Sequence, residues 1–448
     1  MTTSLVWFRR DLRLSDNPAL VEAVREADDV VGVFCLDPAL LGPAGDVRRH
    51  HLFRTLAALD ESMDGNLVVR AGDPTSVIPE LAVEVEAASV HLAEDFGPYG
   101  RRRDDAVAEL VTGAGVELVR TGSAYAVPPG SIENKSGTPY KVFTPFSRAW
   151  RDHGWPAPVR RPSSIPWRSA PGDGIPELPD VGEVDLPRAG EDAAGNRLDH
   201  FLRAEVEDYD DARDRPGADA TSRLSPDLKW GALHPRQILA RLGQTAGERT
   251  FATELCWREF YADVLFHRPA SARESMDDRV GSMPWDRGAG ADELFEAWTE
   301  GRTGFPIVDA GMRQLLAEGW MHNRVRMITA SFLVKDLHLD WQRGARWFMR
   351  HLVDGDLASN QHGWQWTAGT GTDAAPFFRI FNPTTQGQRF DPDGTYVRRW
   401  IPELAAVPAK WIHAPAGAPD GVPAGYPEPI VDHREEREES LRRYGATR

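Results

Sequence analysis

The sequence predicts an α/β domain with a parallel sheet, followed by a long connector and an all-α region. Three observations predict this class. Short apolar runs alternate with helical patterns over the first 125 residues, a stretch rich in proline and glycine follows, and the pattern from residue 196 onward is almost wholly helical. Strands that alternate with helices are typical of a parallel sheet covered by helices.

The α/β part shows its strands as five apolar runs, at residues 4–8, 30–36, 67–70, 89–92 and 116–119. The helical stretches between them lie at about 17–27, 46–63, 75–87 and 101–113. The first helix opens at Asp16-Asn17-Pro18, a capping residue followed by proline. This order predicts a Rossmann-like domain over residues 1–125. Arg9-Arg10-Asp11 stands where a dinucleotide fingerprint needs glycines, so we do not expect a dinucleotide bound in the usual way.

The connector is predicted over residues 126–195, where proline and glycine are frequent and no hydrophobic period is visible. The helical domain is predicted over residues 196–448, with short breaks at proline and glycine pairs. No internal repeat or low-complexity tract interrupts it.

Composition limits the compartment and the partners. The net charge of −16 argues against a generic nucleic-acid binder, although a local basic face is compatible with it. Two cysteines, Cys35 and Cys256, indicate a reducing compartment rather than a disulfide framework. The N-terminus MTTSLVWFRRDLRL has charges where a signal peptide needs an apolar core, and no later run is long enough to span a membrane. We expect a soluble cytoplasmic protein.

The most informative stretch is residues 320–366. Val325, Ile328, Phe332 and Leu333 recur at the spacing of one buried helix face. The stretch also contains polar groups and tryptophans in an apolar context, namely Asn323, Arg324, Arg326, Asp354, Asp356, Asn360, Trp364 and Trp366. Such groups are costly to bury unless they meet a polar ligand. A cofactor with a flat apolar ring and a polar edge would suit them.

Two other segments have the composition of binding sites. Residues 221–225 place three hydroxyls beside Arg223 just before a helix, which indicates either a phosphate cradle or a helix cap with a turn. On the next long helix, Glu254 and Arg258 are four residues apart and could form an ordinary surface ion pair. Trp257 beside them could instead stack on a nucleobase.

Arginines of the helical region could supply the local basic face, and for each of them a solvated surface is the alternative. They are Arg213, Arg258, Arg324, Arg379, Arg389, Arg398 and Arg399. A metal site is not expected, because Asp354-Gly355-Asp356 lacks the spacing of a calcium loop and no histidine or cysteine cluster has zinc spacing.

Several longer motifs occur together and in order: WFRRDLRLSDNPAL, TPYKVFTPF, TSRLSP, ELCWREFY, TGFPIVDAGMRQL, GWMHNRVRMITASFLVKDL, GDLASNQHGWQW, TGTDAAPFFRIFNPTTQG and YPEPIVDH. Through these motifs the chain resembles the photolyase/cryptochrome family over nearly its whole length, and most closely the class I cyclobutane pyrimidine dimer photolyases. The resemblance implies an N-terminal antenna-binding α/β domain and a C-terminal FAD-binding and DNA-binding helical domain.

The resemblance also implies roles for individual residues. FAD would be bound by Tyr209, Thr221, Ser222, Arg223, Leu224, Ser225, Trp320, Asn323, Arg326, Asp354, Asp356 and Asn360. A flipped-out pyrimidine dimer would be contacted by Glu254, Trp257, Asn323, Met327 and Trp366. The DNA backbone would be contacted by Arg213, Arg258, Arg324 and Arg379. An electron relay to the surface would run through Trp364, Trp341 and Trp285.

The implied reaction is light-dependent repair. Photoexcited, fully reduced FAD passes an electron to the dimer, the dimer splits, and the electron returns. Asn360 would sit beside the flavin nitrogen that takes up a proton, and Glu254 would donate a hydrogen bond where charge develops. The implied partner is ultraviolet-damaged DNA, single- or double-stranded. No membrane or obligatory protein partner is implied, and we expect a monomer.

Finer assignments rest on fewer residues. Asn323 and Met327 stand where photolyases for the (6-4) product have histidines, which favours cyclobutane dimers. The surroundings of Cys35 and Tyr99 resemble members that bind 8-hydroxy-5-deazaflavin as antenna more than those that bind methenyltetrahydrofolate. The chain departs from the relatives at Phe251 and at Gln361-His362. A cryptochrome photoreceptor, a (6-4) photolyase, a thermal flavin oxidoreductase and a purely structural helical protein are the alternatives.

Overall fold

The structure is a computed structural model, and it describes residues 1–372 and 378–447. Part of the motif TGTDAAPFFRIFNPTTQG therefore lies outside the described residues. The chain divides into two compact units. The first contains residues 1–181, 187–207 and 222–269, and the second contains residues 182–186, 208–221 and 270–448.

The first unit contains a five-stranded, wholly parallel sheet with strand order β3-β2-β1-β4-β5. In chain order the strands are β1 (Thr3–Phe8), β2 (Asp29–Leu36), β3 (Leu67–Ala71), β4 (Ala87–Glu94) and β5 (Glu117–Ser123). All five follow the predicted apolar runs, because strands buried on both faces are apolar at successive positions. The α/β fold class is thus confirmed.

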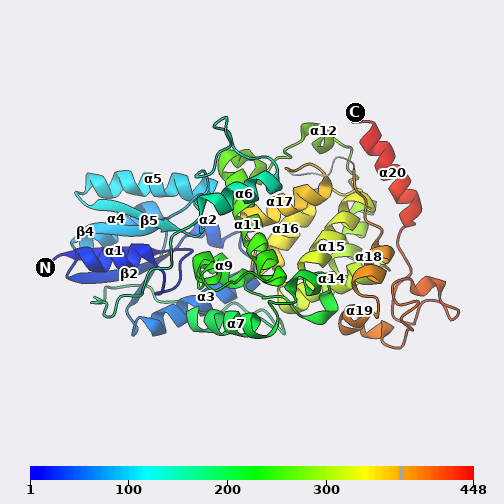
Figure 1. Ribbon diagram of the computed structural model, residues 1–448, viewed down its shortest axis with the longest axis horizontal. Helices are drawn as coiled ribbons and strands as arrows, with labels where there is room; N and C mark the ends of the chain where they lie inside the picture. Colours follow the sequence, from blue (N-terminus) through cyan, green and yellow to red (C-terminus); the bar gives the residue numbers. More distant parts are fainter. Residues whose placement is uncertain (373–377, 448) are drawn as a thin grey trace. The chain divides into compact units, whose positions relative to one another are not determined.

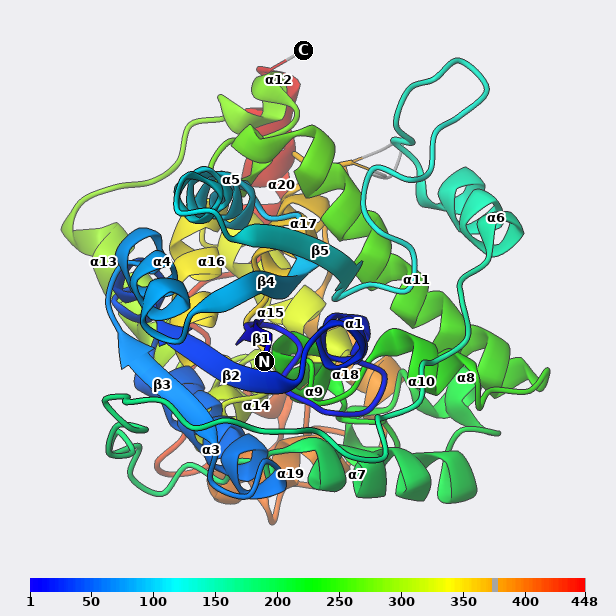
Figure 2. The ribbon, with the colours of Figure 1, turned by 90° about the vertical axis from the view of Figure 1, so that its left-hand side faces the viewer.

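Helices cover both faces of this sheet (Figures 1 and 2). Leu5 and Trp7 of β1 pack with α4 (Pro74–Glu84) and α5 (Pro98–Gly113), whereas Val6 and Phe8 pack with α1 (Pro18–Glu26) and α3 (Asp46–Ser62). Successive strand residues point to opposite faces, so one strand supplies both cores. The short helix α2 (Pro38–Leu41) follows β2.

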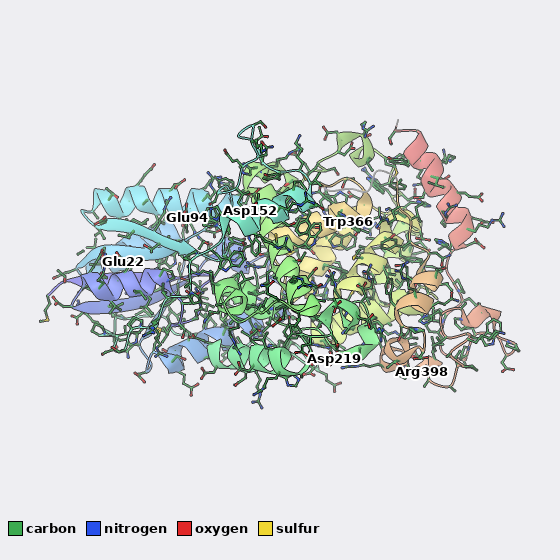
Figure 3. All side chains as sticks on the ribbon, viewed as in Figure 1. Glu22, Glu94, Asp152, Asp219, Trp366 and Arg398 are labelled. Carbon is green, nitrogen blue, oxygen red and sulfur yellow. The ribbon has the colours of Figure 1, made fainter. Side chains whose placement is uncertain are left out.

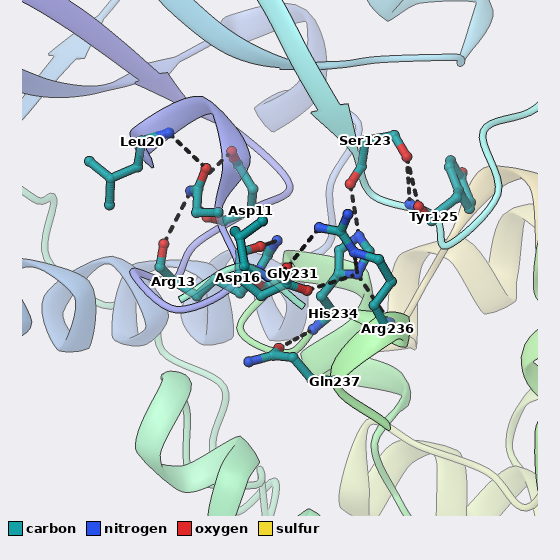
Figure 4. A network of polar contacts seen from close by, with 12 residues as sticks. Asp11, Arg13, Asp16, Leu20, Ser123, Tyr125, Gly231, His234, Arg236 and Gln237 are labelled. Carbon is teal, nitrogen blue, oxygen red and sulfur yellow. Dashed lines mark hydrogen bonds and ion pairs between the residues drawn. The ribbon is translucent and has the colours of Figure 1, made fainter. Parts of the chain in front are cut away.

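The loop after β1 replaces the glycine fingerprint with a buried polar network (Figure 4). Asp16 accepts hydrogen bonds from Arg236 Nη2 at 2.8 Å and from the backbone of Val159 at 2.9 Å. Arg13 Nη1 donates to the carbonyl of Gly231 at 3.0 Å. Gly231 has φ +70°, and a Cβ there would lie 1.9 Å from the Arg10 carbonyl oxygen. This loop therefore binds the helices that follow the connector, which explains its arginines and acids.

The connector and the segments after it add further helices to the first unit. These are α6 (Phe143–His153), α7 (Glu191–Ala204), α9 (Ser225–Trp230), α10 (Pro235–Leu239) and α11 (Ala246–His267). The sequence pattern did not predict α6, which lies inside the proline-rich connector. It packs against α11 (Figure 1).

The second unit is helical. Its longer helices are α13 (Ala289–Thr299), α14 (Pro306–Glu318), α15 (Asn323–Lys335), α16 (Trp341–His351), α17 (Leu357–Ala368), α18 (Pro383–Phe390) and α20 (His433–Gly445). Shorter turns of helix are α8 (Tyr209–Ala212), α12 (Asp278–Gly281), α19 (Thr395–Trp400) and the 3-10 helices η1 (Pro216–Ala218), η2 (Pro269–Ala272), η3 (Pro402–Leu404) and η4 (Pro415–Gly417). Val325, Ile328, Phe332 and Leu333 of α15 are at most 1% exposed, as their spacing predicts.

Candidate functional site

The segment between α16 and α17 forms a polar wall inside the second unit. Asp354 is buried, and its Oδ2 accepts a hydrogen bond from Arg326 Nη2 at 2.8 Å. Arg326 also donates through Nε to the carbonyl of Met321 at 2.7 Å. Asp354 Oδ1 is buried with no hydrogen-bond partner among the described residues. A buried carboxylate oxygen in this state is suited to a ligand that donates a hydrogen bond.

The first turn of α17 continues this wall. Asp356 caps the helix by accepting a hydrogen bond from the backbone of Ser359 at 3.1 Å. Asn360, one turn on, is half-buried, and its Nδ2 donates to the carbonyl of Ala345 at 3.1 Å and to Gln361 Oε1 at 2.9 Å. These bonds hold the Asn360 amide in one orientation.

The two residues that depart from the relatives, Gln361 and His362, anchor α17 to the segment around η2. Gln361 Nε2 donates to the carbonyl of Ala272 at 2.6 Å. His362 lies 3.0 Å from Ser271 Oγ through Nε2 and 2.8 Å from the Ala358 carbonyl through Nδ1. Burial lowers the pKa of His362 to about 4, so the ring is neutral at pH 7. The departure thus replaces small residues by side chains that fix the helix.

The beginning of α15 carries three further predicted residues. Asn323 is exposed and Met327 half-buried, and their spacing of four places them on one helix face. Arg324 forms two hydrogen bonds with Asp214 Oδ1, at 3.2 and 2.7 Å, and its guanidinium lies over the Phe390 ring. Trp320 is half-buried and meets His322 edge to face.

The predicted phosphate-binding residues lie before and within the first turn of α9. Tyr209 is buried, with Arg213 6.0 Å from its ring centroid. Thr221 Oγ1 is buried without a hydrogen-bond partner among the described residues. Arg223 has φ +49°, a left-handed conformation that costs free energy for a residue with a Cβ. Ser225 begins α9, so the alternative of a helix start also describes part of this segment.

Helix α11 carries Glu254, Trp257 and Arg258, all half-buried. Arg258 donates to the carbonyls of Ala124 and Leu228 at 3.0 and 3.1 Å, and it lies over the Tyr125 ring at 4.7 Å. These contacts occupy the guanidinium within the first unit. The departure at Phe251 is buried and packs on Phe201 with ring centroids 4.7 Å apart.

The sequence interpretation gave no role to two neighbours of these residues. Phe143, the first residue of α6, stacks on Trp257 with ring centroids 3.5 Å apart and planes 7° apart. Glu259 is buried and accepts hydrogen bonds from Trp150 Nε1 at 2.6 Å and from the backbone of Ala126 and Val127. Burial raises the pKa of Glu259. The aromatic spacing of Phe143, Phe146 and Trp150 was the available signal for α6.

The predicted relay tryptophans are Trp364, Trp341 and Trp285, all in the second unit. Trp364 is buried, and its ring lies 5.0 Å from Phe348. Trp341 is also buried and donates through Nε1 to Ser275 Oγ at 3.2 Å. Trp285 is partly buried against the same core.

Trp366 on α17 is half-buried (Figure 3). The guanidinium of Arg379 lies 5.8 Å from its ring centroid. Arg379 itself is exposed, so this arrangement places a cation beside a partly exposed indole ring.

The predicted antenna residues lie near the carboxyl edge of the sheet. Cys35 is buried at the end of β2 and donates to the Gly72 carbonyl at 3.4 Å, and burial raises its pKa to about 12. Tyr99 in the first turn of α5 donates to Asp37 Oδ2 at 2.6 Å. A cavity of about 10 Å³ lies at the same edge, lined by residues of the ends of β1, β4 and β5 that include Arg10 and Tyr125.

Two kinds of feature were not found. The described ranges hold no group of three or more histidine, cysteine or acidic residues placed to bind a metal ion. Over the part of the chain that the structure describes, no helix is both long enough and apolar enough to cross a membrane.

Comparisons with known proteins place these features in a family. Residues 4–163 match the protein-family model described as DNA photolyase, and residues 251–446 match the model described as FAD binding domain of DNA photolyase. A protein of Agrobacterium fabrum named deoxyribodipyrimidine photo-lyase is 40% identical, covering 99% of this chain and 98% of its own. The chain belongs to the photolyase/cryptochrome family, which confirms the predicted family, and it contains that family's FAD-binding domain.

Solved structures agree with this assignment. A bacterial class III photolyase from Agrobacterium tumefaciens is similar with a TM-score of 0.94 and 39% identity, over 100% of this chain and 98% of that one. A cryptochrome from Synechocystis is similar with a TM-score of 0.89 and 30% identity, over 99% of both chains. The comparisons do not separate class I from class III.

Proposed function

We propose that this protein splits cyclobutane pyrimidine dimers in DNA under blue or near-ultraviolet light, using reduced FAD. The observation that carries the proposal is the polar wall of the FAD-binding domain. There the buried Asp354 Oδ1 and Thr221 Oγ1 have no hydrogen-bond partner among the described residues, and the Asn360 amide is held in place. These groups fit a cofactor with a polar edge, as FAD has.

The proposed FAD-binding residues are those predicted from the sequence. They are Tyr209, Thr221, Ser222, Arg223, Leu224, Ser225, Trp320, Asn323, Arg326, Asp354, Asp356 and Asn360. When bound, reduced FAD supplies the light-absorbing group and the electron that opens the dimer. Arg326 holds the Asp354 carboxylate ionised and oriented, and Asn360 offers a neutral amide at the ring edge.

The proposed substrate residues act on a dimer turned out of the DNA stack. Trp257 offers a flat apolar face, and Glu254, when protonated, donates a hydrogen bond to the carbonyl on which charge develops. Asn323, Met327 and Trp366 complete this set. Arg213, Arg258, Arg324 and Arg379 contact the DNA backbone in the proposal, and the exposed Arg379 is best supported by its placement.

The remaining assignments are also proposals. Trp364, Trp341 and Trp285 carry electrons between flavin and surface, supported by the burial of the first two. Residues 1–125 bind an antenna at Cys35 and Tyr99, 8-hydroxy-5-deazaflavin ahead of methenyltetrahydrofolate. Residues 126–195 connect this domain to the catalytic domain of residues 196–448. The protein is a cytoplasmic monomer without an obligatory protein partner, and class I is its proposed subfamily.

The test is repair of a thymine dimer in a short single-stranded oligonucleotide by the chemically reduced protein. Loss of the dimer in blue light but not in darkness is the expected result. Glu254→Ala should slow repair, whereas Glu248→Gln on the same helix should not, because Glu248 is an exposed capping residue.

A blue-light photoreceptor without repair is the second candidate, favoured by the similarity to the Synechocystis cryptochrome. Protein that carries FAD and binds the damaged strand but never repairs it would support the photoreceptor or a (6-4) photolyase. An oligonucleotide that contains a (6-4) product separates these two.

A further inference from the structure

The indole of Trp257 lies flat against the ring of Phe143. The centroid distance of 3.5 Å and the angle of 7° describe a nearly parallel stack, which covers one face of the indole. Phe260 and Tyr261 contact the indole at its periphery, with centroids 5.8 and 5.5 Å away. Trp257 nevertheless remains partly exposed, whereas Phe143 is buried. The indole is thus supported from one side by a residue that lies far away in the sequence.

The support comes from a helix that is attached independently. Phe146, one turn after Phe143 on α6, packs on Phe260 with centroids 5.1 Å apart. Trp150, one turn further, donates its indole hydrogen to the buried Glu259 at 2.6 Å. Helix α6 is therefore held on α11 at two places that do not touch Trp257. The loss of the Phe143 ring would remove the support of Trp257 without releasing the helix.

We propose that Phe143 is a positioning residue for dimer recognition, which holds the Trp257 indole in its stacking orientation before the substrate arrives. A side chain that is already fixed loses less conformational entropy when it binds. A parallel aromatic pair is worth about 0.5–1.5 kcal/mol beyond the apolar area that it buries. The inference rests on the proposed function, because it assumes that Trp257 stacks on the dimer.

The experiment measures, in darkness, the dissociation constant of the FAD-loaded protein for an oligonucleotide with one thymine dimer and for the same oligonucleotide without it. Phe143→Leu should weaken dimer binding about threefold to tenfold, the free energy of the lost aromatic pair expressed as affinity. Binding of the undamaged oligonucleotide should not change, because phosphate contacts determine it. Phe143→Tyr keeps the ring and should restore dimer affinity.

Two controls separate positioning from stability. Phe146→Leu removes an equally buried ring from the same helix, so it should lower the melting temperature but leave dimer affinity unchanged. In a Trp257→Leu background, Phe143→Leu should weaken binding no further, because the residue through which it acts is gone. Equal losses from Phe143→Leu and Phe146→Leu, or undiminished losses in the Trp257→Leu background, would overturn the inference.

The same data distinguish this inference from the proposed function. If the wild-type protein does not prefer the damaged strand, or if Trp257→Leu binds it as tightly, the proposed function itself fails. If both of those results are as expected and Phe143→Leu still binds like the wild type, only the role of Phe143 is refuted.

Discussion

Asp354 accepts a hydrogen bond from Arg326 at 2.8 Å through Oδ2, while its buried Oδ1 has no partner among the residues that the structure describes. The arginine orients the carboxylate and leaves one oxygen for a donor from outside the chain. An ordinary structural ion pair would satisfy both oxygens, because an unsatisfied buried acceptor costs about 1–3 kcal/mol. The pair is therefore better explained as part of a ligand site.

Replacement of Asp354 by alanine should weaken FAD binding roughly tenfold to a hundredfold, the equivalent of one lost hydrogen bond to a charged group. Bound flavin can be measured from the visible absorbance of protein after gel filtration. Asp292→Ala is the matched control, because it breaks a 2.8 Å ion pair with Arg343 on the surface of the same unit. Full retention of flavin by Asp354→Ala would show that this carboxylate does not hold the cofactor.

Acid should destabilise the protein through His362. Burial lowers the pKa of this residue to about 4, whereas in the unfolded chain it is 6.5. Between these values the unfolded chain holds a proton that the folded chain does not, so the free energy of unfolding falls as the pH falls from 6.5 toward 4. The full contribution of this shift is about 3 kcal/mol.

His362→Gln should remove this part of the pH dependence, which is measured by urea unfolding at several pH values. His200→Gln provides the control, because the His200 side chain is 69% exposed. An unchanged slope in His362→Gln would mean that other buried histidines account for the acid sensitivity.

Photoreduction should depend on Trp364. Indole is among the side chains most easily oxidised, and phenylalanine is far harder to oxidise. Trp364→Phe should therefore abolish most of the light-driven reduction of oxidised flavin, while protein reduced chemically beforehand still repairs dimers. Trp411→Phe is a suitable control, since Trp411 is a partly buried tryptophan of the same unit outside the proposed relay. An equal loss in both variants would contradict a specific relay.

The sequence predicted the elements whose local pattern agrees with their environment. The run 30–36 is apolar at nearly every position because β2 is buried on both faces, and the face of α15 follows the helical period. Helix α6 was missed because prolines dominate the composition around it, although Phe143, Phe146 and Trp150 have helical spacing. Its existence depends on packing against α11, which a local pattern does not contain.

The candidate site shows the same division. The types and order of the residues in α15 and α17 predicted a polar ligand, because buried polar groups need partners. The stack of Phe143 on Trp257 joins distant parts of the chain, and so does the contact of His362 with Ser271. Such pairings are determined by tertiary packing, so only the structure could reveal them.

The carboxylate of Glu259 should stabilise the attachment of α6 and of the connector's start to α11. It accepts hydrogen bonds from Trp150 and from two consecutive backbone groups, those of Ala126 and Val127. Glutamine keeps the shape but replaces one acceptor oxygen with an amide donor, which would face a backbone donor. Glu259→Gln should therefore lower the free energy of unfolding by about 2–4 kcal/mol, as expected when buried polar groups lose their partners.

The control is Glu248→Gln, at the exposed capping box of the same helix, where glutamine serves as well as glutamate. It should change the free energy of unfolding by less than about 0.5 kcal/mol. Denaturant unfolding of both variants measures the difference. Trp150→Phe should lose part of the same stability, and its effect should not add fully to that of Glu259→Gln, because the two residues share one hydrogen bond. Full additivity would mean that the carboxylate and the indole stabilise the protein separately.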